Sequence, residues 1–119
     1  MGNVHHQFYS NIAIAAALLL LPATAARAQV TLAQAVAMIN SNQRDEVEAG
    51  IQSFGVLGGP QAADALVQRV RGGLPPDLLD LTITTLTALG QPAAGPLLFE
   101  LSAHRRPEVR LKAVEAIAA

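Results

Sequence analysis

The sequence predicts an all-α protein, a short α-solenoid in which antiparallel helix pairs stack side by side. Three observations predict this fold. The residue pattern repeats every 31–32 positions, the apolar residues of each copy follow the helical period, and glycine and proline separate the segments. Aromatic residues make up only 3% of a chain that is 51% hydrophobic. The core must therefore consist of Ala, Leu, Val and Ile, which suit closely packed helices.

The repeat is visible when the chain is shifted against itself. A shift of 32 residues places Leu57-Gly58-Gly59-Pro60 on Leu89-Gly90-Gln91-Pro92. A further shift of 31 places Pro76-Asp77-Leu78 on Pro107-Glu108-Val109. The aligned apolar positions are Val47 with Leu79, Ile51 with Ile83 and Val114, Phe54 with Leu86 and Ile117, and Leu66 with Leu98. Three copies in register predict a repeated structural unit.

Within each copy the apolar residues are spaced by three and four positions, as on one face of a helix. The first helices end at Leu-Gly, where Gly58 or Gly90 can adopt the left-handed conformation, and Pro60 or Pro92 then starts a second helix. Thr31 is an N-cap candidate. Negative charge at Asp45, Asp77 and Glu108 suits helix starts. The predicted helices are 31–41, 45–57, 61–71, 77–89, 93–103 and 108–119. A strand is the alternative for 81–87, because Leu81-Thr82-Ile83-Thr84 alternates.

Residues 44–119 resemble bacterial HEAT-repeat proteins, of the type related to the repeats of phycobilin lyases. The stretch Pro107–Ile117 resembles the first helix of such a repeat, and Ala88–Leu97 resembles the turn and second helix. Arg110 matches an arginine common in the family, but Val47 and Leu79 stand at the aligned positions. A ladder of repeated Asp–Arg contacts is therefore in doubt. The resemblance implies a superhelix with a concave surface that binds proteins.

The first 28 residues are interpreted as a secretory signal peptide. The uncharged run Asn11–Leu21 is too short for a membrane span, which needs roughly 20 residues. Small residues Ala26 and Ala28 predict cleavage between Ala28 and Gln29. The segment before the run carries no Lys or Arg, and a buried N-terminal helix of a cytosolic protein is the alternative. We therefore expect a HEAT-repeat domain at 29–119 in a periplasmic or secreted protein that has no membrane segment after processing.

No residue pattern predicts catalysis, a cofactor or a metal site. Cysteine is absent, and His104 is the only histidine after residue 28. Ser102 lies two residues from His104 and would point to another face of a helix. The acidic pairs Asp45-Glu46 and Asp77/Asp80 are typical of helix starts and solvated faces. Two adjacent arginines, Arg105-Arg106, do not form a nucleic-acid surface.

The predicted function is a non-catalytic module that binds or scaffolds another protein. In a solenoid the second helices present their polar positions along one face. The candidate contact residues there are Asp64, Gln68, Arg69, Arg71, Glu100 and His104. An alternative is an accessory or lyase-like subunit that handles a ligand or a modifying enzyme.

The C-terminal end of the repeat pattern is unusual. The sequence stops at Ala118-Ala119, before the Leu-Gly that closes the first helix of both earlier copies. The stripe of Val109, Val114 and Ile117 is therefore expected to lack a covering helix. The sequence favours a fragment of a longer protein, and end-to-end self-association through the last helix is the alternative.

Overall fold

The computed structural model describes residues 30–119, and every regular element within them is helical. The predicted signal peptide and its cleavage junction between Ala28 and Gln29 lie outside the described residues. Residues 31–119 form one compact unit. The prediction of an all-α fold is confirmed, and a strand at 81–87 is wrong because these residues lie inside a helix.

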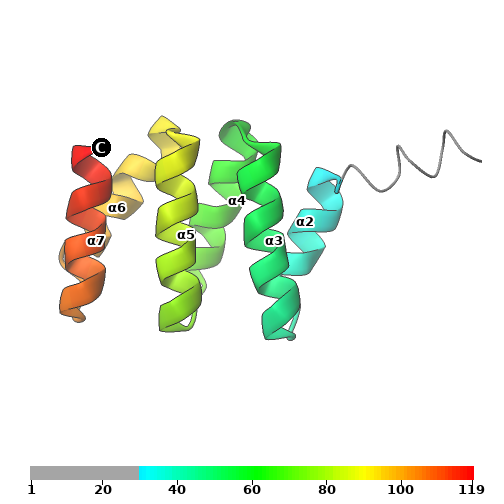
Figure 1. The fold of residues 1–119 in the computed structure, drawn as a ribbon, viewed down its shortest axis with the longest axis horizontal. Coiled ribbons are helices and arrows are strands. Elements are labelled where there is room, and N and C mark those ends of the chain that lie inside the picture. Colours follow the sequence, from blue (N-terminus) through cyan, green and yellow to red (C-terminus); the bar gives the residue numbers. More distant parts are fainter. Residues whose placement is uncertain (1–29) are drawn as a thin grey trace, which may run out of the picture. The chain divides into compact units, whose positions relative to one another are not determined.

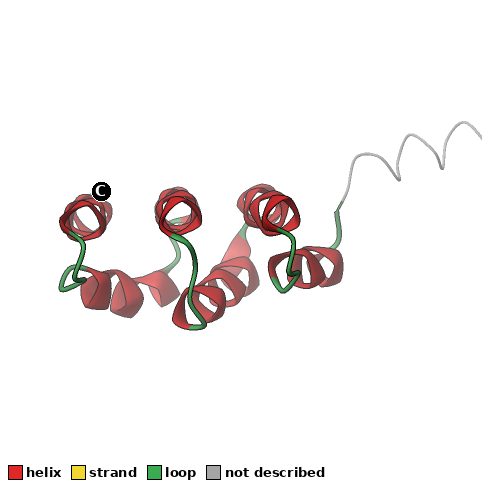
Figure 2. Ribbon diagram, turned by 90° about the horizontal axis from the view of Figure 1, so that it is seen from below, coloured by secondary structure: helices red, strands yellow, loops and turns green. Residues whose placement is uncertain are grey.

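Six α-helices and one 3₁₀ turn follow one another in the described part of the chain. In order they are α2 (Leu32–Ile39), α3 (Arg44–Leu57), α4 (Gly59–Arg71), α5 (Pro76–Leu89), η1 (Pro92–Ala94), α6 (Gly95–Leu101) and α7 (Pro107–Ala118). Figures 1 and 2 show two layers, with α3, α5 and α7 side by side in one and α2, α4 and α6 in the other. Within the first layer α5 contacts both α3 and α7, while α2 packs on α3 and α6 on α7.

Local sequence signals explain most helix ends. The Thr31 hydroxyl accepts a hydrogen bond from the Gln34 N–H, and the Gln34 side chain accepts one from the Thr31 N–H, which forms a capping box. Gly90 closes α5 in the left-handed conformation, as predicted. Gly58 also has a positive φ of 68°, but its ψ of −172° is extended, so α4 starts at the very next residue. The left-handed prediction is therefore wrong for Gly58.

Two of the predicted helices are shorter in the structure. The first stops at Ile39, where the Asn40 side chain donates to the Val36 carbonyl and turns the chain. The segment predicted as one helix at 93–103 is divided into η1 and α6. Pro96 explains part of this division because it has no N–H for a hydrogen bond in the first turn of α6. The other four helices begin and end within two residues of the predicted bounds.

The core lies between the two layers. Its largest fully buried side chains are Phe54, Ile51, Leu66, Ile83, Leu86 and Thr82. Thr82 is the only buried polar residue in 30–119, and its hydroxyl donates to the Leu78 carbonyl at 2.7 Å. Gly50 lies at the crossing of α3 and α2, where an added Cβ would be 2.9 Å from the Ile39 backbone nitrogen. The missing side chain at Gly50 thus lets the first two described helices pack closely.

Candidate functional site

The six residues predicted to contact a partner lie on or beside two neighbouring helices. Asp64, Gln68, Arg69 and Arg71 lie on α4, Glu100 lies on α6, and His104 follows α6. Both helices belong to the same layer, which Figure 2 shows below the layer of α3, α5 and α7. The structure joins only two of the six by a polar contact. The Arg71 Nη1 lies 3.0 Å from the Glu100 Oε2 in a solvent-exposed ion pair between α4 and α6.

Gln68 and Arg69 line an open cleft of about 350 Å³ between α4 and α2. Its opposite wall is formed by the end of α2 and the following turn, with Asn40, Ser41 and Asn42. The cleft wall is therefore rich in amide and hydroxyl groups that can donate and accept hydrogen bonds. Such a wall suits the polar backbone or side chains of a protein ligand.

Arg69 is held in place by helix ends rather than left free for a partner. Its Nε donates to the Ile39 carbonyl at 2.7 Å, and its Nη1 donates to the Gly73 carbonyl. Carbonyls at a helix C-terminus lack partners inside the helix and carry partial negative charge. Arg69 therefore joins α2 to the end of α4, a role that sequence reasoning missed.

His104 lies apart from the other candidates. Its Nδ1 accepts a hydrogen bond from the Arg106 backbone N–H at 3.1 Å, and its carbonyl accepts one from Arg110. It borders a small pocket of about 70 Å³ with Leu74, Pro76 and Leu79. These contacts shape the turn between α6 and α7. The structure does not bring Ser102 and His104 into a hydrogen bond with each other.

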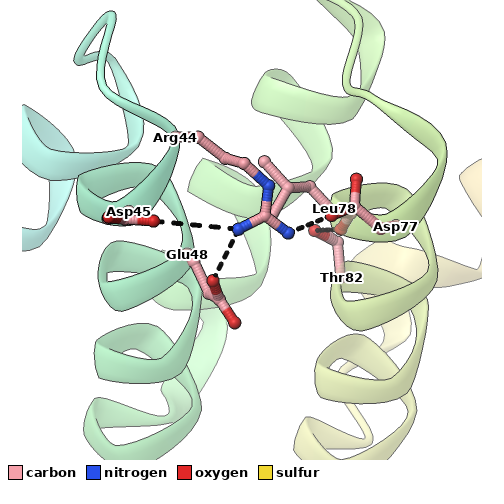
Figure 3. Close-up of polar contacts among 6 residues, drawn as sticks. All are labelled: Arg44, Asp45, Glu48, Asp77, Leu78 and Thr82. Carbon is pink, nitrogen blue, oxygen red and sulfur yellow. Dashed lines mark hydrogen bonds and ion pairs between the residues drawn. The ribbon is translucent and has the colours of Figure 1, made fainter.

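Ion pairs also join successive helices of the other layer. Arg44 at the start of α3 contacts Asp77 at the start of α5, and its Nη1 lies 2.9 Å from Glu48 (Figure 3). The hydrogen bond from Arg44 is the main reason why the pKa of Asp77 lies below its usual value. Further along the layer, Lys112 of α7 lies 2.9 Å from Asp80 of α5. The two interhelical pairs of this layer thus use different residue types, one Arg–Asp and one Lys–Asp, and no single contact repeats along it.

A second candidate surface lies at the outer side of α7. The expectation of an uncovered stripe is correct for Val114 and Ile117, which are 52% and 50% exposed, and wrong for Val109, which packs against the core. The aligned residues of α5, Ile83 and Leu86, are each 1% exposed. Sequence reasoning missed Leu111, which is 61% exposed on the same helix.

Next to these residues, a groove of about 420 Å³ runs between the end of α5, the start of α6 and the end of α7. Phe99 and Ile117 line it, and Phe99 is 74% exposed. Exposed apolar side chains that gather at one place mark binding surfaces more often than isolated ones do. This end of the described unit can therefore bury further apolar surface.

Neither surface carries a metal-binding arrangement, since no three His, Asp or Glu side chains gather within residues 30–119. None of the helices in this range is long and apolar enough to cross a membrane. No family model, curated protein or solved structure matches the chain.

Proposed function

We propose that the chain is an exported, non-catalytic module that binds another protein through the face formed by α4 and α6. The proposed architecture is a short α-solenoid of HEAT-like helix pairs, supported by the sequence period and by the two layers of helices in Figure 2. In such an architecture the helices of one layer present a continuous surface to a partner.

One observation carries the choice of face. The cleft lined by Gln68 and Arg69 lies between α4 and α2, and the solvent-exposed Arg71–Glu100 ion pair joins α4 to α6, so both features lie on α4 and in the same layer of helices. The cleft supplies hydrogen-bonding groups and the ion pair supplies charge of both signs. A polar protein segment could meet both together, and exposed charges favour specificity and fast association more than raw affinity.

The experiment uses a charge swap on the face. In Arg71→Glu/Glu100→Arg the two side chains can still pair, but the charges on the surface are exchanged. We expect the wild-type chain to retain a protein from an envelope extract, the swap to lose that protein, and both to give the same helical circular dichroism. The captured protein is then purified and titrated against both chains. Equal binding by the swap variant would contradict the proposal.

The proposal of export concerns residues that precede the described part of the chain. If residues 1–28 are a signal peptide, the mature protein begins at Gln29, in the periplasm or outside the cell. The intact mass of the protein recovered from the culture medium and periplasm tests this directly. A full-length mass confined to the cytoplasm would contradict it.

The alternative of a ligand-handling accessory subunit has one observation in its favour, the groove beside Phe99 and Ile117. Its volume of about 420 Å³ is within the range of small-molecule sites. Native mass spectrometry of the purified chain distinguishes the two functions. A bound chromophore or other small molecule would favour the alternative, and loss of that mass in Phe99→Glu would place it in the groove.

A further inference from the structure

The outer side of α7 differs from the aligned sides of α3 and α5 in both burial and polarity. Positions 51, 83 and 114 are aligned by the repeat and are 0%, 1% and 52% exposed. Positions 48, 80 and 111 are likewise aligned, and they hold Glu48, Asp80 and Leu111. Glu48 and Asp80 each form an ion pair, whereas Leu111 is exposed. The last helix therefore presents apolar side chains where the earlier helices have charge or are covered.

The opposite end of the same layer carries exposed acidic charge that is not paired with another helix within residues 30–119. Asp45 and Glu46 lie in the first turn of α3, and the Asp45 side chain is 99% exposed. The repeat aligns Asp45 with Asp77, which is bound by Arg44 of the preceding helix of its layer. Within residues 30–119 no helix precedes α3 in its layer (Figure 1), and Asp45 forms an ion pair only with Arg44 of its own helix, 3.9 Å away.

Basic charge lies at the corresponding place on α7. Arg106 is the N-cap residue of α7, and Arg110 lies in its first turns, where its Nη1 donates to the His104 and Arg105 carbonyls. Glu108 lies between these two arginines in the sequence. The starts of α3, α5 and α7 point to the same edge of the layer, so the acidic and basic groups share that edge at opposite ends of the unit (Figure 1). A translation along the layer brings Asp45 and Glu46 of one copy to the start of α7 of another, where Arg106 directly precedes Pro107, the residue that the repeat aligns with Arg44.

In a head-to-tail arrangement, the second layer of helices also continues from one copy to the next. It holds α2, α4 and α6, and the first layer holds α3, α5 and α7, so a following copy places its α2 after α6 and its α3 after α7 (Figure 2). Residues 30–43, which contain α2, include no ionisable side chain. Packing α2 near the exposed Phe99 of α6 would therefore bury no charge.

We propose that a second copy of this chain docks head to tail on the outer side of α7, with the α2–α3 end of one copy covering Leu111, Val114 and Phe99 of the other. The acidic start of α3 meets the arginines at the start of α7. Because this contact joins two different surfaces, it repeats from copy to copy and produces open chains or a ring. The inference rests on the repeat architecture proposed above, but it uses surfaces other than the α4–α6 face.

The test is sedimentation velocity of the purified chain over a wide concentration range, with one variant for each end. Val114→Arg blocks the α7 surface, and Asp45→Lys/Glu46→Lys reverses the acidic end. We expect the wild-type chain to associate as its concentration rises, Val114→Arg to remain monomeric, and the acidic-end variant to need about tenfold more protein or higher for the same association. Leu111→Lys serves as a second variant if Val114→Arg fails to fold.

Mixing the two variants gives the sharpest result. Val114→Arg keeps an intact acidic end and Asp45→Lys/Glu46→Lys keeps an intact α7 surface, so an equimolar mixture forms a one-to-one dimer that grows no further. Val56→Arg is the matched control, because Val56 is 88% exposed on α3 and its aligned residue Ala88 is exposed on α5. It should associate like the wild-type chain.

Three results would overturn the inference. If the wild-type chain stays monomeric at every concentration, a second copy is not the occupant of the α7 surface. This conclusion also holds if a small molecule or another protein covers that surface. Wild-type association by Asp45→Lys/Glu46→Lys indicates a symmetric dimer of α7 surfaces. Association of both α7 variants places the contact elsewhere. The Arg71→Glu/Glu100→Arg variant should still associate, so failure of the proposed function and failure of this inference are separable.

Discussion

At the scale of single residues, three ion pairs join neighbouring helices within residues 30–119. Arg44 binds Glu48 within α3 and Asp77 across to α5, so one guanidinium pairs with two carboxylates (Figure 3). All three side chains are accessible to solvent, and such pairs contribute little stability individually. The Arg44–Asp77 pair instead helps to align α3 with α5, because it joins the start of α3 to Asp77, the first charged residue of α5.

The Arg44–Asp77 contact predicts a pH-dependent contribution to stability. The hydrogen bond from Arg44 lowers the pKa of Asp77 from its usual 3.8. The ionised carboxylate therefore stabilises the folded state fully at pH values above 3.8. That contribution is lost as the pH falls through the lowered pKa of the folded state. Asp77→Asn should therefore reduce the melting temperature at neutral pH and become equivalent to the wild type in strong acid. Thermal melts across this range check the prediction.

Asp45→Asn is the matched control for Asp77→Asn. Asp45 also lies in the first turn of a helix, but its side chain is 99% exposed and no other helix pairs with it. Removing its charge should cost less at neutral pH than removing that of Asp77. An equal fall in melting temperature for both variants would show that Asp77 stabilises the fold through the helix dipole rather than through its contact with Arg44.

At the scale of elements, the sequence predicts helices well where apolar spacing and punctuation agree. For α3 and α5 the stripes end at Leu-Gly, and both helices end at that leucine in the structure. The apolar pattern predicts one continuous helix through Pro96, and it does not reveal the division of 93–103 into η1 and α6. Contacts between elements were the least predictable feature, since the partners of Arg44, Arg69 and Lys112 come from helices about 30 residues away.

The packing of α2 on α3 gives a prediction based on two glycines of one helix. Replacing a helical glycine by alanine ordinarily stabilises the helix by about 1 kcal/mol. At Gly50 the new Cβ would lie 2.9 Å from the Ile39 backbone nitrogen, and a contact that close forces α2 to move. Overpacking of this kind costs about 1–3 kcal/mol. Gly50→Ala should therefore give a net loss in the free energy of unfolding.

Gly55→Ala is the comparison for Gly50→Ala. Its Cβ would meet only the Thr85 Cγ2, at 3.2 Å, and a side-chain methyl can yield more easily than a backbone. We expect Gly55→Ala to be neutral or to stabilise by up to about 1 kcal/mol. Urea denaturation of the two variants measures the difference. Stabilisation by both would mean that α2 adjusts on α3 without cost.

At the scale of the whole molecule, burial falls sharply at the outer side of α7. Phe54, Leu86 and Ile117 are aligned by the repeat, and they are 0%, 1% and 50% exposed. The sequence predicted the uncovered stripe, because a repeat pattern shows which positions face a neighbour. It did not predict that Val109 is buried against the core, because its inward position depends on how α7 rests on α5 and α6.

This difference in burial predicts that aligned residues contribute unequally to stability. Leu86→Ala removes a side chain that is buried within the core and should cost about 2–5 kcal/mol. Ile117→Ala removes one that is half in water, so at low protein concentration it should cost about 1 kcal/mol or less. If a second copy covers α7, the cost of Ile117→Ala grows with protein concentration, since association stabilises the folded state by mass action. The cost of Leu86→Ala should not increase with protein concentration in this way. Urea denaturation at two protein concentrations separates these cases, and an equal cost for both variants when the protein is dilute would show that α7 is already covered within the monomer.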